Sequence, residues 1–265
     1  MRSLVKFILL LATFCIAFDL PLEGQECAPQ ESACQVEYVK DVRPFQLSLF
    51  EPVQIFSADK SISGIRLNVI YGVNANVTGL DIGFFNRVSG DMKGLQAGFI
   101  NYVEGNAYGI QDGFVNISKG NVTGLDIGLF NSVSGDMNGL QAGFINYVEG
   151  SAYGIQYGFV NVSKGNVLGL QSGFINYADN TCGIQDGFVN YTQRNLTGYQ
   201  VGGYNSALLT EGFQLGLVNK SQFMEGVQIG FVNYADDLKG IQIGFVNILT
   251  SRELFKVVPI LNFSW

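Results

Sequence analysis

The chain lacks the side chains from which most active sites are built. None of its 265 residues is histidine, and histidine is both the commonest general base and the commonest metal ligand in proteins. A Ser-His-Asp arrangement is therefore impossible, and no phosphate loop of the Walker kind occurs. Gly-x-Gln-x-Gly phrases recur along the chain, but no helix is expected after them, so they are not dinucleotide fingerprints. We expect no catalytic residue and no cofactor.

Two sets of carboxylates recur at fixed spacing and could in principle do chemistry. Asp81 and Asp126 hold the same place in copies of one repeat that lie three copies apart. Stacked strands would separate them by roughly 14 Å, which is too far for the paired acid–base work that cleaves glycans. Asp91 and Asp136 recur in Gly-Asp turns, and some Gly-Asp repeats bind calcium. Most other copies carry Asn or another residue there, so turn formation explains them better. We expect a non-enzymatic protein without a metal site.

A recurrent tyrosine is the candidate for recognition. It lies eight residues after the first glycine of the repeated phrase and occurs in five copies, namely Tyr102, Tyr147, Tyr177, Tyr191 and Tyr234. Such a column could bind sugar or protein, and the alternative is packing at strand edges. Nucleic acid is not expected as a partner, because a net charge of −7 repels a polyanion.

The N-terminus has the form of a secretory signal peptide over residues 1–17. A basic start precedes an apolar run from residue 7 to residue 17 that ends in small residues. The run is too short for a transmembrane helix, so the sequence predicts export and cleavage. Residues 18–35 form a polar leader that contains Cys27 and Cys34. These two could pair as a disulfide in an oxidising compartment, or remain free thiols.

An internal repeat determines the elements that carry these residues. The phrase Gly-(Leu/Ile)-Gln-x-Gly-Phe-(Ile/Val)-Asn recurs every fifteen or fourteen residues, in twelve copies over residues 79–247. We number its first glycine 0, so that position 2 is Gln or Asp, position 4 is Gly, position 7 is Asn and position 3 varies. A degenerate copy begins at Gly64. The phrase is rich in Ile, Val and Phe and is bounded by turn residues, which predicts a strand and a turn in each copy.

The period allows two all-β architectures. In a parallel β-solenoid with one repeat per coil, each residue lies about 4.8 Å from its equivalent, and identical amides hydrogen-bond into ladders. The predicted amide ladder is Asn86, Asn101, Asn116, Asn131, Asn146, Asn161, Asn176, Asn190, Asn205, Asn219, Asn233 and Asn247. The alternative is an antiparallel β-barrel of the outer-membrane type with one strand per repeat. The apolar C-terminus that ends at Trp265 favours that alternative.

Two observations favour the solenoid. Residues 79–123 and 124–168 are identical at 38 of 45 positions, so three repeats were copied together. Three added coils extend a solenoid, whereas three added antiparallel strands reverse the direction of the copy. In a barrel, Asp112 and Asp186 at position 3 would face lipid at a cost of about 1–3 kcal/mol each. We predict the solenoid. Positions 5 and 6 are both apolar, so the sequence does not decide which of them points inward.

Both ends of the array are expected to be capped, because a stack must hide its last apolar edge. We expect residues 36–78 to form an N-terminal cap with the degenerate repeat, and residues 248–265 to form a C-terminal capping strand. The repeated phrase, the entry PFQLSLFEPVQIF and the exit VVPILNFSW resemble the leptospiral-type surface-repeat proteins of diderm bacteria. The resemblance covers roughly residues 43–265. It implies an exported protein at the cell surface or in the outer membrane, and it implies no catalytic residue.

Two functions fit these expectations. The first is a non-enzymatic scaffold or interaction surface whose partner is a protein or glycan at the cell surface, since repeat proteins bind through extended faces. In this reading the variable column at position 3 is framed by fixed columns. The second is an outer-membrane β-barrel with a pore or anchoring role, which would associate with a membrane. The periplasm and the extracellular medium are alternative locations.

Overall fold

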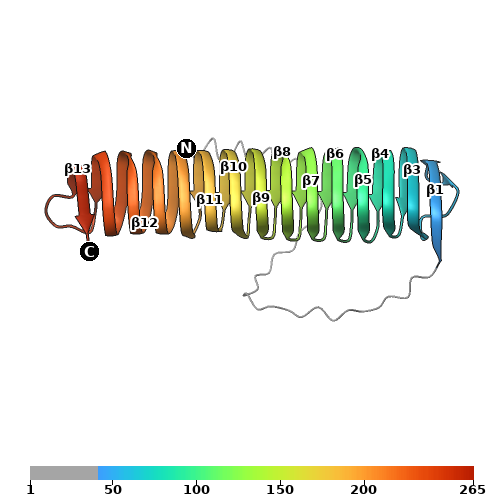
Figure 1. Cartoon of the computed structure of the whole chain (residues 1–265), viewed down its shortest axis with the longest axis horizontal. Coiled ribbons are helices and arrows are strands. Elements are labelled where there is room, and N and C mark those ends of the chain that lie inside the picture. The colour runs from blue at the N-terminus through green and yellow to red at the C-terminus, as the bar shows by residue number, and fades with distance from the viewer. Residues whose placement is uncertain (1–40) are drawn as a thin grey trace. The chain divides into compact units, whose positions relative to one another are not determined.

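The structure, a computed structural model, describes residues 41–265. These residues form one array of β-coils that follow one another in a row from β1 to β13 (Figure 1). The predicted signal peptide (residues 1–17), the polar leader (residues 18–35), Cys27 and Cys34 lie outside the described residues. Within residues 41–265 no helix is long and apolar enough to cross a membrane.

Thirteen strands make up a single sheet in the order β13-β12-β11-β10-β9-β8-β7-β6-β5-β4-β3-β1-β2. Their bounds are β1 Val42–Phe50, β2 Val53–Gln54, β3 Ser61–Asn74, β4 Val77–Val88, β5 Met92–Val103, β6 Ala107–Ser118, β7 Val122–Val133, β8 Met137–Val148, β9 Ala152–Ser163, β10 Asn166–Ala178, β11 Asn180–Thr192, β12 Asn195–Leu249 and β13 Val257–Ser264. The strands from β4 to β11 each correspond to one coil, and β12 runs on through several coils.

Consecutive coils pair in parallel and in register. Between β10 and β11, Gly169 lies beside Gly183, Gln171 beside Gln185 and Asn176 beside Asn190. The same parallel pairing joins every consecutive pair of strands from β3 to β12. The predicted parallel β-solenoid is therefore confirmed. The antiparallel barrel is wrong, because equal coils stacked in one winding direction can only place their strands parallel.

The glycine at position 0 is required by both the backbone and the stacking. Gly169 has φ +136°, in a region that L side chains rarely adopt. A Cβ there would also lie 2.1 Å from the carbonyl oxygen of Gly154 in the preceding coil. Leu168 is exposed and Leu170 is half-buried on either side of this glycine. Those exposures follow ordinary strand alternation, and it is the positive φ that redirects the extended chain, so we call the glycine at position 0 the corner glycine of each coil.

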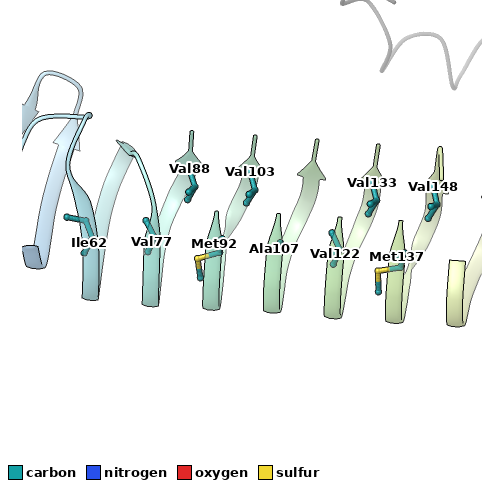
Figure 2. Close-up of a cluster of buried hydrophobic side chains, with 10 residues drawn as sticks. All are labelled: Ile62, Val77, Val88, Met92, Val103, Ala107, Val122, Val133, Met137 and Val148. Atoms are coloured by element: carbon teal, nitrogen blue, oxygen red, sulfur yellow. The ribbon is translucent and has the colours of Figure 1, made fainter. Parts of the chain in front are cut away.

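The interior of the coils is narrow and holds one apolar strip. Its side chains come from two positions, the residue two before the glycine and the residue at position 9. Figure 2 shows the N-terminal part of the strip, in which Val77, Met92 and their equivalents lie in one row and Val88, Val103 and their equivalents in another. All of them are buried. Further along, the strip becomes polar in places, where Thr181 and Thr192 hydrogen-bond at 2.8 Å.

Both ends of the array are closed by strands that do not follow the repeat. β1 runs parallel to β3, and the short β2 turns back antiparallel on β1. At the other end, β13 runs antiparallel to the end of β12. Asn262 of β13 donates to Gln242 at 2.8 Å, so the last strand also receives the end of the interior amide ladder.

Candidate interaction surface

The asparagines at position 7 point into the coils and bind one another. Asn146 shows the pattern: its Nδ2 donates to Oδ1 of Asn161 at 2.8 Å and to the carbonyl of Tyr157 at 2.9 Å, and its Oδ1 accepts from Asn131 at 2.9 Å. The side-chain ladder is continuous from Asn86 to Asn247. All twelve asparagines are buried, so their amides hold the coils in register and offer nothing to a ligand.

A second ladder runs through position 2. Gln156 donates to Gln141 at 2.9 Å, and Gln171 donates to Gln156 at 2.8 Å. Two aspartates interrupt this ladder. Asp81 accepts two hydrogen bonds from Arg66, at 2.7 and 2.6 Å, and both side chains are fully buried.

The second aspartate of this ladder has no such partner. Asp126 accepts one hydrogen bond from Gln141 at 3.2 Å, and its Oδ1 has no partner in the described part of the chain. Burial raises the pKa of the Asp126 carboxyl to about 7, and the side-chain amides of Gln141 and Asn116 only partly offset this effect. Asp81 and Asp126 are thus interior residues.

The aspartates of the turns have structural partners. Asp91 Oδ1 accepts from the backbone N–H of Asn106 at 2.9 Å, and Asp136 Oδ1 accepts from that of Ser151 at 2.7 Å. Each side chain therefore ties its own turn to the next turn of the stack. Residues 41–265 contain no group of three or more Cys, Asp or Glu side chains placed to hold a metal ion.

The outward side chains of positions 1, 3 and 5 form what we call the phenylalanine face. Position 5 carries Phe84, Phe99, Phe114, Leu129, Phe144, Phe159, Phe174, Phe188, Gly203, Leu217, Phe231 and Phe245. These phenylalanines have between 45% and 69% of their surface exposed. Position 1 adds a row of mainly Leu and Ile, and position 3 adds the variable column. Solvated aromatic rows of this length are unusual on a protein surface.

The rings of the phenylalanine face stack on one another along the rod. The ring centroids of Phe144 and Phe159 lie 5.0 Å apart, those of Phe159 and Phe174 5.0 Å, and those of Phe174 and Phe188 5.1 Å. The ring planes deviate from parallel by at most 9° in these pairs. Because each ring is held by its neighbours, the face is a preordered apolar surface and loses little side-chain entropy on contact.

Charge is nearly absent from this face. Among the residues at positions 1, 3 and 5, only Asp112 and Asp186 are charged. The ion pairs outside the interior lie on other parts of the coils, such as Arg194 with Asp179 in a turn and Lys239 with Glu225. A shallow apolar depression crosses the face near its C-terminal end, where Gly202, Gly216 and Gly230 form the floor and Leu215 and Leu217 the rim.

No protein-family model, curated protein or solved structure matches this chain. The chemistry of the surface is therefore what indicates a role. The features that could serve recognition are the phenylalanine face and the predicted tyrosine column, and they occupy different sides of the coil. The buried carboxylates and the amide ladders belong to the interior.

The tyrosines of the predicted column lie at position 8, after the strand alternation breaks at positions 5 and 6. Four of them are half-buried and Tyr191 is exposed. Tyr177 stacks on Tyr191 with ring centroids 5.6 Å apart, and the ammonium of Lys164 lies 5.4 Å from the ring of Tyr147. Other residue types interrupt the column between most of its members. Its binding role stays a prediction.

Sequence reasoning did not identify the phenylalanine face as such. It notes a variable column at position 3 framed by fixed columns, and that position does lie in the middle of this face. Alternation counted from Gln at position 2 turns positions 3 and 5 outward, whereas alternation counted from Asn at position 7 turns them inward. The repeat alone therefore does not decide the direction of the phenylalanines.

Proposed function

We propose that this protein is an exported, non-enzymatic scaffold at the cell surface of a diderm bacterium, and that the phenylalanine face is its interaction surface. The observation that supports this proposal is the exposed aromatic ladder on a rigid rod. Export is supported by the signal-like first 17 residues. The partner classes that fit a cell surface are a protein or a glycan, and the periplasm or the medium are alternative destinations.

The size of the face supports a binding role. Positions 1 to 5 span roughly 13 Å along the strand, and twelve coils span roughly 55 Å along the rod, which gives about 700 Å². The largest apolar patch on an ordinary monomer measures about 300–600 Å² and is often functional. The interior does not require these phenylalanines, because the core is made by other positions. Their repetition therefore calls for a role outside the fold.

Cell fractionation tests the location and the role of the face together. The chain would be expressed in a diderm host, and the amounts of chain bound to the envelope and released from the cells would be measured. Surface proteolysis of intact cells would show whether the envelope-bound chain is exposed at the cell surface. We expect the double variant Phe99→Ser/Phe144→Ser to be released, since a polar face loses its contact. The matched control is Tyr108→Ser/Tyr153→Ser, which replaces aromatics of similar exposure (42% and 39%, against 45% and 48%) off the face.

The phenylalanine variant and the tyrosine control can be compared only if both remain folded. Circular dichroism must first show that both variants keep the β-sheet signal of the wild type. Equal retention of the two variants would exclude the phenylalanine face as the interaction surface. Recovery of the wild-type chain in the cytoplasm would exclude export.

A further inference from the structure

We propose that the occupant of the phenylalanine face is a second copy of this chain, packed face to face with its rod antiparallel to the first. This proposal rests on the proposed function, in which the face is an interaction surface, and it names the partner. Four properties of the face carry it: its area, its regular spacing, its charge pattern and the order of residues at position 3.

The area is sufficient for a stable dimer. Ten overlapping coils would cover about 600 Å² of flat surface on each copy, and about 1,200 Å² in total. Specific interfaces need about 1,000 Å² or more, with an apolar centre. Two sheets packed face to face at about 10 Å would bring the two rows of outward side chains into contact, as in a β-sandwich.

The regular spacing also fits a second copy. The face is a grid in which every row repeats once per coil, with the phenylalanine rings of consecutive coils about 5 Å apart. A close-packed partner must present a flat apolar surface with the same period over the same length. The chain itself carries such a surface, and an isologous dimer uses the same patch on both copies.

The two aspartates of the face decide the direction of the rods. A two-fold axis along the rod would place each coil opposite its own copy, so that Asp112 would meet Asp112 and Asp186 would meet Asp186. Like charges would then be buried together in an apolar interface, which is strongly unfavourable. A two-fold axis along the strands reverses the order of the coils and keeps each row opposite itself, so neither aspartate directly faces its own copy unless the axis passes through its coil.

The same aspartates indicate the register. Ser172 and Asp186 occupy position 3 in consecutive coils. If the axis passes between these two coils, Asp186 of each copy faces Ser172 of the other, and the hydroxyl can donate to the carboxylate. The coil of Asp112 then faces the last coil, which begins at Gly240 beside β13, so that Asp112 remains at the wet edge of the overlap. In this register each Asp186 has a hydroxyl donor and Asp112 is at the edge, while the two Asp186 carboxylates lie diagonally across the axis, about 4.8 Å apart along the rod.

Sedimentation velocity on the full chain tests the dimer. We expect twice the monomer mass at micromolar concentration, and at least a tenfold weaker dimer for Phe174→Glu, since this residue lies beside the axis and a buried carboxylate would be unpaired. The matched control is Leu168→Glu in the same coil, before the corner at Gly169. The two side chains are similarly exposed, at 45% and 50%, and only Phe174 lies on the face. The control must dimerise as the wild type does.

Photo-crosslinking tests the register without a disruptive substitution. Phe144 would be replaced by the photoreactive benzoylphenylalanine, and light and heavy isotope-labelled chains would be mixed so that bonds between copies can be recognised. In the proposed register the coil of Phe144 faces the coil of Leu217, which is 62% exposed. We expect intermolecular bonds at or beside Leu217. The same label at Tyr153, off the face, should give none.

Three results would overturn the proposal. A chain that stays monomeric at 100 micromolar has another occupant on this face or none, even when residues 1–40 are present. A dimer that survives Phe174→Glu as well as it survives Leu168→Glu uses another surface. Bonds from position 144 to its own coil in the partner would show parallel rods. A monomer with envelope retention that still depends on Phe99 and Phe144 would refute the dimer and leave the proposed function standing.

Discussion

Arg66 and Asp81 form a fully buried ion pair in which the guanidinium donates to both carboxylate oxygens, at 2.7 and 2.6 Å. Both residues occupy position 2 of their coils, so the pair lies within the ladder that glutamine forms elsewhere. Asn68 donates to Asp81 as well, at 3.1 Å. Three coils further on, Asp126 holds the position of Asp81 in the copied segment, but the preceding position 2 is Gln111. The copied block therefore carries the aspartate without its cationic partner, because Arg66 lies before the block.

This contrast predicts opposite effects for one substitution at two equivalent sites. Asp126→Gln restores the residue of most other coils and removes an unpartnered buried oxygen, so we expect a gain of about 1–3 kcal/mol in the free energy of unfolding at pH 7. Asp81→Gln leaves Arg66 buried and unpaired, and we expect a loss of about 3–5 kcal/mol. Urea unfolding of the two variants measures both. If the two substitutions changed the free energy of unfolding in the same direction, Asp126 would not be the aspartate that lacks a partner.

The Asp126 carboxyl also predicts a dependence of stability on pH. Its folded pKa of about 7 lies above the ordinary value of 3.8. Between these two values the folded chain keeps a proton that the unfolded chain releases. The free energy of unfolding should therefore decrease as pH rises from 4 towards 7, by about 1.4 kcal/mol per pH unit, and change little above that.

Asp126→Gln isolates this contribution from that of the other acidic groups. The quantity to plot is the wild-type unfolding free energy minus that of the variant, from pH 4 to pH 8. We expect the difference to become more negative with rising pH and to level off near pH 8. A difference that is flat over the whole range would show that Asp126 titrates normally.

We expect the loss of one asparagine from the ladder to lower the free energy of unfolding clearly. In Asn146→Ala the side chain of Asn131 loses its acceptor, and Asn161 loses a donor, in a site closed to water. We expect a loss of about 2–4 kcal/mol, because buried groups left without partners cost about 1–3 kcal/mol each. The control in the same coil is Asn138→Ala at an exposed position, which should change the unfolding midpoint little.

The corner glycines predict a strict limit on side-chain size. Gly169→Ala would force a Cβ to 2.1 Å from a backbone oxygen at φ +136°, and backbone cannot move aside as a side chain can. We expect this variant to lose the cooperative thermal transition. Gly203→Ala is the control, since the nearest atoms to its Cβ would belong to the ring of Phe188, at 2.9 Å, which can tilt. If both variants melt like the wild type, the corner tolerates a side chain.

Much of the fold follows from the repeat itself. Gln at position 2 and Asn at position 7 stay fixed while position 3 varies, and only a parallel in-register stack brings each amide next to its own copy. This pattern is enough to predict the parallel winding and the residues of the asparagine ladder. The copied block of three repeats adds the argument from direction, since whole coils can be added to a stack without reversing it.

The orientation of the apolar rows could not be derived in the same way. Strand alternation assigns one side to every second residue, but positions 5 and 6 both leave the interior. At positions 5 and 6 the period of two fails, so two consecutive apolar residues indicate no direction. The Arg66–Asp81 pair is readable in principle, because the degenerate copy GIRLN carries arginine at position 2. When that copy is interpreted only as a cap, its arginine is not recognised as a member of the glutamine ladder at position 2.

β13 closes the C-terminal edge of the stack. A stack of identical parallel strands resembles the spine of an amyloid fibril, in which each edge templates the next chain. β13 reverses this direction, and its Asn262 takes the place of a further glutamine. An incoming coil would have to pair in the opposite sense and out of step with the repeat. The antiparallel end strand thus acts as a terminator of polymerisation, and it allows a fibril-like core to exist as a molecule of fixed length.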